Sequence, residues 1–277
     1  MNETANLWID LARSDLKSSR LLYNNGHFRT SYFFFQQSAE KANKAFAHFA
    51  GLLSDKEFKD IQHDQLKIYR KTIAKQEGEI KTLVQVLEPY PKVANHQILQ
   101  QANFRDYHKT LSEGLSFIDS LRNYDLVNIS TQDLNLILGQ LNTLKNTKLK
   151  IPRNFEDVLK NQMVGIADWI GQFETQEATN AKTELLEFID DPDNSKKFYD
   201  IVVKQMLPML IDLAFVNMTL YFCAILTVQH SSLTRYPDNN VNPEKVYTKK
   251  LPLVRKQKEF MDLLDEALIK LIKINAT

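Results

Sequence analysis

Glycine and proline are scarce in this sequence, whose 277 residues include 7 Gly and 8 Pro. Average proteins contain about 7% Gly and about 5% Pro, so both residues are used well below their usual frequency. Short strands and tight turns depend on these residues, and loops that cradle phosphates depend on Gly. The scarcity disfavours β-sandwiches, barrels and dinucleotide-binding folds, and it predicts an all-α protein with long helices.

The sequence also lacks an excess of charge and a second cysteine. Lys and Arg total 35 against 34 Asp and Glu, so any contact with nucleic acid needs a local basic patch. Cys223 cannot form a disulfide within the chain, and its apolar neighbours predict a buried thiol in a reducing compartment. The first residues include acids and no apolar run, which predicts no signal peptide and a cytoplasmic location.

One long apolar run extends from Met206 to Val228. Its length approaches that of a membrane span, but Pro208, Asp212 and Asn217 interrupt it and no similar run accompanies it. A helix that is apolar on all sides is more often the central helix of a soluble bundle. We therefore expect a buried helix here and no membrane contact.

Apolar residues recur at three- and four-residue spacings along most of the chain, which predicts amphipathic helices. The first two should form an antiparallel hairpin, because Asn24, Asn25 and Gly26 separate them. Near Pro208 we expect a kink. The predicted helices cover residues 5–24, 29–53, 55–76, 93–123, 131–146, 154–173, 175–190, 195–234 and 253–274.

Two blocks of the sequence contain motifs in a recognisable order. An Ala-x-x-Asp-Leu core precedes Gln-x-x-Glu-Lys-x-x-Lys-Ala and His-Asp-x-Leu, and a later TRYPD segment precedes a tyrosine-containing segment and a last amphipathic helix. In this order they resemble the HEPN family, the higher eukaryotes and prokaryotes nucleotide-binding domain. The matching residues are Ala12, Asp15, Leu16, Gln37, Glu40, Lys41, Lys44, Ala45, His63, Asp64, Leu66, 234–238 and 246–248.

The resemblance implies an antiparallel up-down bundle of four to five helices that binds a nucleotide or RNA. Residues 1–74 and 195–277 would form this bundle, and residues 75–194 would be an inserted helical lobe. The resemblance also implies a homodimer, a possible nucleotidyltransferase-type protein partner, and a place in a toxin-antitoxin or abortive-infection system. The lobe leaves a third possibility open, a scaffold for protein interactions.

The helix predicted over 29–53 carries polar residues on one face. Gln37, Lys41 and Lys44 recur at four- and three-residue spacings, so they could present amide and ammonium groups to a phosphate or a base. The alternative is an ordinary solvated face on which Glu40 pairs with Lys44.

The TRYPD segment supplies three further candidates. Arg235 offers a planar fork for phosphate, Tyr236 a ring that can stack on a base, and Asp238 an acceptor for ribose hydroxyls. Alternatively, Arg235 and Asp238 lock the loop through one local ion pair.

A run of cations without an acid follows this segment and forms a local excess in a nearly neutral chain. Such a run could attract a polyanion, although a solvated loop and helix start would have the same composition. The cations are Lys245, Lys249, Lys250, Arg255, Lys256 and Lys258.

Some HEPN proteins resemble metal-independent ribonucleases, in which an Arg precedes a His by a few residues. Here Arg20 precedes His27 at the end of the first helix, and His230 precedes Arg235 in the reverse order. The fit is poor, so His230 and Arg235 are only candidate catalytic residues and we favour binding without catalysis. The sequence has no metal-ligand spacing and no glycine-rich phosphate loop, so we expect no metal and no cofactor.

Overall fold

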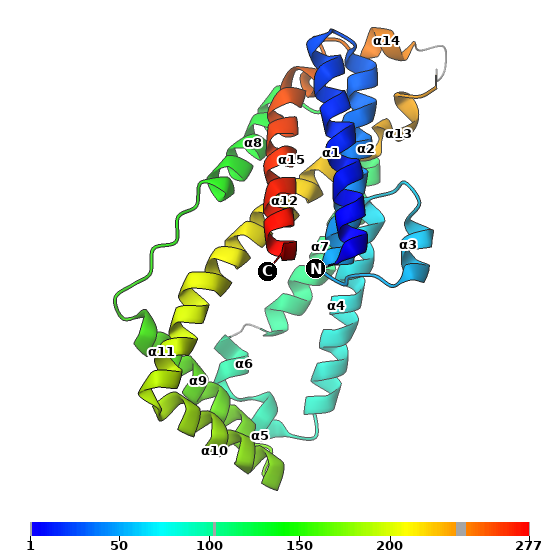
Figure 1. The fold of residues 1–277 in the computed structure, drawn as a ribbon. Helices are drawn as coiled ribbons and strands as arrows, with labels where there is room; N and C mark the ends of the chain where they lie inside the picture. Colours follow the sequence, from blue (N-terminus) through cyan, green and yellow to red (C-terminus); the bar gives the residue numbers. More distant parts are fainter. Residues whose placement is uncertain (1, 102–103, 237–241, 277) are drawn as a thin grey trace. The chain divides into compact units, whose positions relative to one another are not determined.

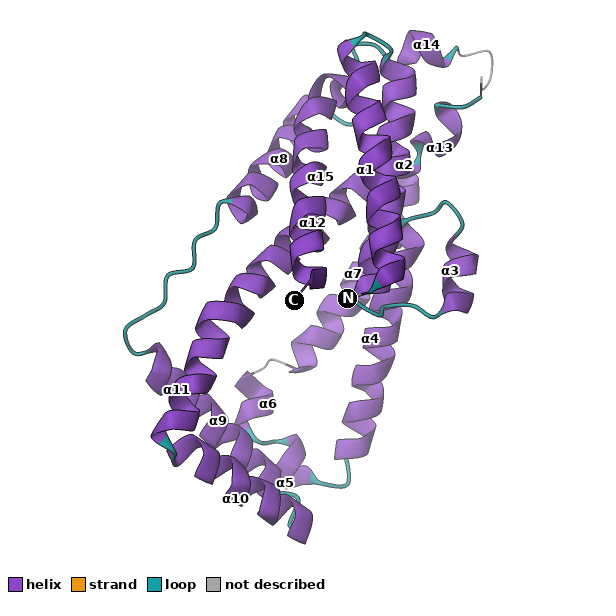
Figure 2. Ribbon diagram, viewed as in Figure 1, coloured by secondary structure: helices purple, strands orange, loops and turns teal. Residues whose placement is uncertain are grey.

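The computed structural model describes residues 2–101, 104–236 and 242–276, and all regular structure in these ranges is helical (Figures 1 and 2). The all-α prediction is confirmed. The elements are α1 (Glu3–Asn24), α2 (Phe28–Phe49), α3 (Asp55–Ile61), α4 (Leu66–Leu87), α5 (Pro91–Ala94), α6 (Gln97–Gln101), α7 (Phe104–Ser120), η1 (Leu121–Asn123), α8 (Thr131–Lys145), α9 (Phe155–Gly171), α10 (Gln176–Asp190), α11 (Pro192–Ile201), η2 (Val202–Met206), α12 (Leu207–Val228), α13 (His230–Leu233), α14 (Pro243–Val246) and α15 (Pro252–Ala276).

The chain forms two compact units. Unit 1 comprises Met1–Thr72, Phe117–Thr147 and Ile211–Thr277, and unit 2 comprises Ile73–Ser116 and Lys148–Leu210. The chain therefore enters unit 2 twice.

These units differ from the predicted bundle and lobe in two places. Helix α8 was predicted in the lobe, but its buried residues Leu134, Leu138 and Leu141 belong to the core of unit 1 together with α15. Residues 195–210 were predicted in the bundle, but α11 packs on α9 and α10 in unit 2. In both cases the helices against which a helix packs decide the unit. The partner of α8 is α15, which is distant in sequence, whereas α11 packs on the two helices that precede it in the chain.

Helices α1 and α2 form the predicted hairpin in unit 1. Gly26, with φ of +81°, occupies the turn in a conformation that L-residues rarely adopt. Ile9 and Leu16 on α1 and Tyr32 and Phe35 on α2 are at most 2% exposed and share one core. Each such buried side chain contributes about 1.5 to 3 kcal/mol, so the hairpin is a main source of stability in this unit.

The predicted apolar helix is present, and its second half lies in the core of unit 1. Phe215, Leu220 and Cys223 are at most 1% exposed, which confirms the buried thiol. In the described part of the chain, the helical stretch Pro192–Val228 is the one stretch with the length and composition of a membrane span, and 44% of its apolar window is buried.

The predicted helix over 55–76 is interrupted, which corrects that expectation. Helix α3 begins with a capping box between Ser54 and Glu57 and ends before Gln62, whose φ is +51°. Asp64 then accepts a hydrogen bond from the backbone N–H of Leu66 at 3.2 Å, where α4 begins. Local capping bonds therefore outweigh the continuous helical pattern here. The predicted helix over 93–123 is likewise divided into α5, α6, α7 and η1.

Unit 2 contains a second helical hairpin, formed by α9 and α10. The indole of Trp169 donates to the Val93 carbonyl at 3.3 Å, which ties α9 to α5. Farther along the chain, η2 is a π-helical turn in which the N–H of Leu207 bonds to the Val202 carbonyl just before Pro208. The irregularity predicted at this proline is thus a π-helical turn.

Candidate nucleic-acid interface

The N-terminal end of α2 holds the TRYPD segment through Arg29. The guanidinium of Arg29 donates to the Thr234 carbonyl at 2.7 Å and to the Glu244 carboxylate at 2.5 Å. This one side chain joins α2 to the end of α13 and to α14. Residues that are more than 200 positions apart in the sequence thus meet at one end of unit 1.

Arg235 and Tyr236 both project from this end. The guanidinium carbon of Arg235 lies 5.1 Å from the centre of the Phe33 ring on α2, which is a cation–π distance. Tyr236 is 66% exposed, so its ring is open to a stacking partner. Asp238, the third predicted residue of this segment, lies outside the described residues.

Three lysines surround the same end of unit 1. Lys245, Lys249 and Lys250 are exposed, and the Lys249 ammonium lies 5.7 Å from the centre of the Phe28 ring. Within the described ranges, neither these lysines nor Arg235 form an ion pair. We call Arg235, Tyr236, Lys245, Lys249 and Lys250 the basic–aromatic surface.

The remaining cations of the predicted run are engaged elsewhere or lie on α15. Arg255 donates to the Thr131 hydroxyl at 2.8 Å, and Lys256 pairs with Glu259 at 2.8 Å. Lys258 is exposed on the same helix. The predicted run therefore divides into Lys245, Lys249 and Lys250, which form no ion pair with a described residue, and a partly engaged part on α15.

The polar residues predicted on one face of α2 are engaged with partners on α1 and α2. Lys41 forms an ion pair with Asp15 on α1, and Lys44 pairs with the buried Glu40 at 2.8 Å. Gln37 donates to its neighbour Gln36 at 3.1 Å. The structure thus shows the pairing that the sequence left open as the alternative.

The TRYPD segment and the polar residues of α2 are at different positions along α2, because the segment is held at Arg29, near the N-terminal end of this helix. Lys41 is twelve residues beyond Arg29, which corresponds to about 18 Å along a helix axis. The Lys44 ammonium also lies 5.1 Å from the centre of the Trp8 ring, so it faces α1. Lys41 and Lys44 therefore stabilise the hairpin, whereas Arg235 forms no ion pair with any residue that the structure describes.

His63 joins the Glu40 pair and was not among the predicted site residues. Its Nδ1 lies 3.2 and 3.3 Å from the two carboxylate oxygens, while its side chain is 64% exposed. The His63-Asp64 pair before α4 is visible in the sequence. Glu40 is 23 positions away, so spacing alone does not reveal that His63 contacts its carboxylate.

His230, a candidate catalytic residue, is buried in the core. It is 0% exposed, and its Nδ1 lies 2.5 Å from the hydroxyl of Tyr247. Burial lowers the pKa of His230 to about 4, against smaller opposing effects of the Leu126 backbone and the Asp125 carboxylate. A neutral imidazole without access to solvent is poorly placed to move a proton to or from RNA.

The other Arg–His pair is also not arranged as a catalytic pair. Arg20 forms ion pairs with Asp262 and Asp265 on α15, and its guanidinium donates to the Met261 carbonyl at 3.1 Å. His27 is exposed at the start of α2, where its side chain makes no capping bond. Arg20 thus holds α1 against α15.

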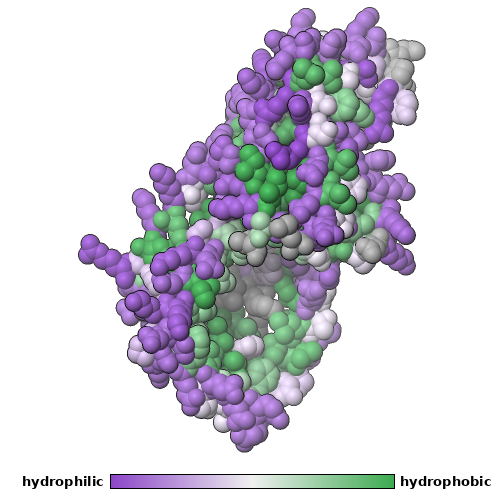
Figure 3. Space-filling view, viewed as in Figure 1, coloured by the Kyte–Doolittle hydropathy of each residue, from purple (hydrophilic) through white to green (hydrophobic). Residues whose placement is uncertain are grey.

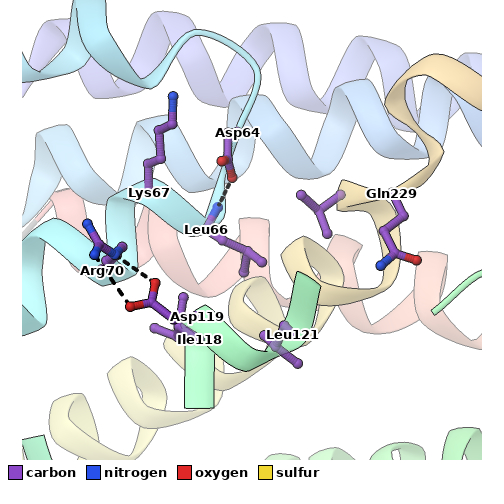
Figure 4. A pocket seen from close by; sticks show the side chains of 9 residues that line it. Asp64, Leu66, Lys67, Arg70, Ile118, Asp119, Leu121 and Gln229 are labelled. Atoms are coloured by element: carbon purple, nitrogen blue, oxygen red, sulfur yellow. Dashed lines mark hydrogen bonds and ion pairs between the residues drawn. The ribbon is translucent and has the colours of Figure 1, made fainter. Parts of the chain in front are cut away.

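A cavity of about 180 Å³ lies on another side of unit 1 (Figure 4). Leu66, Ile118 and Leu121 line its apolar part. At its rim, Arg70 donates to both oxygens of Asp119 at 2.8 and 3.4 Å. This cavity was not predicted, and its lining contains two cations, Lys67 and Arg70, and two acids, Asp64 and Asp119, so it has no excess of positive charge for an anion.

Among the described residues, no group of three or more His, Cys, Asp or Glu side chains could hold a metal ion.

Comparison with known proteins links the chain to one family. Residues 5–118 match the family model of the HEPN domain. No curated protein and no solved structure matches the chain. The matched range continues beyond residue 74, where the predicted bundle stopped, and it ends before the basic–aromatic surface. The resemblance to the HEPN family is confirmed over residues 5–118, and it points to a function related to nucleotides or RNA.

Proposed function

We propose that this protein binds single-stranded RNA, or a similar nucleotide polyanion, on the basic–aromatic surface of unit 1. The observation that carries the proposal is the set of four exposed cations without described carboxylate partners beside the exposed ring of Tyr236. The HEPN match over residues 5–118 supports a ligand of this chemical class.

The two kinds of side chain on this surface have separate roles in the proposal. Arg235, Lys245, Lys249 and Lys250 contact phosphates, and each contact releases counterions from the nucleic acid. Tyr236 stacks on a base, which tolerates any sequence because every base has a π-face. Glu244, the nearby carboxylate, is held by Arg29 and so repels the ligand less than a free acid would.

A single strand fits this surface better than one mononucleotide. The cations come from three segments, namely the end of α13, α14 and the turn before α15. An extended strand has several phosphates and can contact cations on all three segments. The phosphate of a mononucleotide can contact only cations that lie close to one another. The proposed activity is binding without cleavage, because the histidine that precedes Arg235 is buried.

Fluorescence anisotropy with a labelled oligouridylate tests the proposal. We expect Tyr236→Ala to lose about 1 to 3 kcal/mol of binding free energy, the usual contribution of one stacked base. The double variant Lys249→Ala with Lys250→Ala should lower the magnitude of the slope of log K against log salt by about 0.7 for each phosphate that the variant no longer neutralises.

Lys59→Ala is the matched control, because Lys59 is exposed on α3 beyond the opposite end of α2. It should leave both affinity and salt slope unchanged. No measurable binding by the wild-type protein, or an equal loss in the control, contradicts the proposal. Tighter binding of a mononucleotide than of the oligomer would rule out a single strand as the ligand.

A nucleotidyltransferase-type protein partner and a role in a toxin-antitoxin system remain predictions from the family resemblance.

A further inference from the structure

The cavity of about 180 Å³ in unit 1 combines an apolar lining with a polar rim (Figure 4). Its apolar residues Leu66, Ile118 and Leu121 are buried, at 7%, 4% and 4% exposure. Over the face drawn in Figure 3, by contrast, apolar side chains are scattered among hydrophilic ones, so exposure of one such side chain marks no site. Pockets for drug-sized ligands measure about 300 to 1,000 Å³, so this cavity suits one flat ring system rather than a whole nucleotide.

The charges at the rim fit a neutral ring better than a phosphate. Lys67 and Arg70 balance Asp64 and Asp119 in number. A nucleobase is neutral, and its edge carries both donors and acceptors of hydrogen bonds. The combination of a buried apolar lining and a rim of mixed charge therefore matches a nucleobase.

Arg70 provides a flat surface at this rim. Its Nε and one of its terminal nitrogens donate to the two carboxylate oxygens of Asp119 at 2.8 and 3.4 Å. Two bonds to one carboxylate fix the plane of the guanidinium, and the side chain is still 57% exposed. Unstacked RNA bases stack on guanidinium planes of this kind.

Gln229 provides a fixed amide on the lining of the same cavity (Figure 4). Its Oε1 accepts from the backbone N–H of Leu126 at 3.0 Å, and its Nε2 donates to the Tyr124 carbonyl at 2.7 Å. A glutamine amide has two N–H groups and two oxygen lone pairs, so one donor and one acceptor remain without a partner among the described residues. A donor and an acceptor side by side on glutamine pair with the N6 amino group and N7 of adenine.

The cavity lies close along the chain to the basic–aromatic surface. Arg235 follows Gln229 by six residues, which span at most about 22 Å even when fully extended. Both residues belong to unit 1. Lys67 lines the cavity, and its ammonium makes one long bond of 3.5 Å to the Asp60 carbonyl, so it can also contact a phosphate beside a bound base. One strand of a few nucleotides can therefore reach both places.

We propose that this cavity takes one unstacked adenine of the strand, with Arg70 stacked on the ring and Gln229 bonded to its edge. The inference rests on the proposed function, because the basic–aromatic surface holds the strand. That surface binds any sequence, whereas the cavity adds a preference for one base.

Fluorescence anisotropy with matched oligomers tests the preference. We compare a labelled oligouridylate with the same oligomer carrying a single internal adenosine, guanosine or cytidine. The adenosine oligomer should bind about 5-fold to about 150-fold more tightly than oligouridylate, the usual discrimination by one bidentate side chain. Equal binding of all four oligomers, or an equal gain with guanosine or cytidine, overturns the adenine site but leaves the proposed function intact. No binding of any oligomer overturns both.

Two variants connect the preference to the cavity. Val228→Phe fills part of the cavity that Val228 lines, without altering the amide of Gln229, and should abolish the preference for adenosine. Arg70→Lys changes an exposed side chain, keeps its charge and removes its plane, so it should reduce the preference even if the larger ring of Val228→Phe disturbs folding.

Two further variants serve as controls. Tyr236→Ala should weaken the binding of all oligomers and keep the preference, because Tyr236 belongs to the basic–aromatic surface. Val86→Phe makes the same chemical change as Val228→Phe at a position that is 58% exposed on α4, and it should change neither affinity nor preference. A preference that persists in both cavity variants, or disappears in Val86→Phe, contradicts the assignment to this cavity.

Discussion

The burial of His230 affects the stability of unit 1 through its protonation. Its pKa is lowered to about 4 in the folded protein, mainly by burial, from an ordinary value of 6.5. The unfolded chain therefore binds a proton more readily than the folded protein between these two values. Stability from this group is fully present above pH 6.5 and is lost as the pH falls towards 4.

We predict that protonation of His230 lowers the free energy of unfolding by about 3 kcal/mol as the pH falls from about 7 to about 4. One unit of pKa difference between the folded and unfolded states corresponds to about 1.4 kcal/mol. Urea unfolding at several pH values measures the loss. His230→Gln cannot titrate, and we expect it to be less stable at pH 7 but to show a flatter dependence on pH. Parallel pH profiles for the two proteins would mean that His230 is not the group responsible.

Single residues also show where the sequence was informative about the site. Arg235 and Tyr236 were predicted as ligand-binding residues, and the structure leaves both exposed. Lys41 was also predicted as a ligand-binding residue, but its partner Asp15 lies on a different helix, and no local spacing reveals that ion pair. Whether a surface cation is free depends on tertiary contacts, which a helical pattern does not contain.

Between elements, α1 and α2 approach closely because of two small polar residues. The Ser19 hydroxyl donates to the Ser31 carbonyl at 2.7 Å, and the Ser31 hydroxyl donates to the Ser19 carbonyl at 2.8 Å. The amide of Gln257 on α15 donates to the Ser31 hydroxyl at 2.8 Å. Three helices therefore meet at one buried hydrogen-bonded point.

We predict that Ser31→Val destabilises the protein by at least about 2 kcal/mol, because the larger side chain separates the helices and leaves Gln257 without this acceptor. Ser116→Val makes the same chemical change at an exposed position on α7, and it should cost only a few tenths of a kcal/mol. Thermal unfolding of both variants provides the comparison. Equal melting temperatures would show that the α1–α2 contact tolerates extra volume.

The boundaries of a helix were predicted correctly where a local cap marks them. They were predicted wrongly where the backbone interrupts a continuous apolar pattern. The predicted helix over 131–146 is observed as α8, with Ser130 accepting a hydrogen bond from the N–H of Asp133. The predicted helix over 55–76 is divided instead, because Gln62 adopts a positive φ that the apolar periodicity does not encode. The unit to which α8 belongs was not predictable either, since its apolar face fits any core of suitable shape.

For the whole molecule, Cys223 provides a probe of unfolding. It is the single cysteine of the chain, it is 0% exposed on α12, and burial raises its pKa to about 12. At mildly alkaline pH, a rise of about three units from the ordinary value reduces the reactive thiolate about a thousandfold. The protein must therefore open around α12 before the thiol reacts.

We predict that a thiol reagent labels Cys223 at the rate at which the core of unit 1 opens, so that labelling accelerates in parallel with unfolding as urea is added. A Ser116→Cys variant supplies an exposed thiol on α7 that should react at once in the native protein. If Cys223 reacts without urea as fast as this introduced thiol, then α12 is accessible to solvent and the central position of this helix in unit 1 is wrong. If labelling instead follows the unfolding transition, the buried half of the long apolar helix opens only when the core of unit 1 opens.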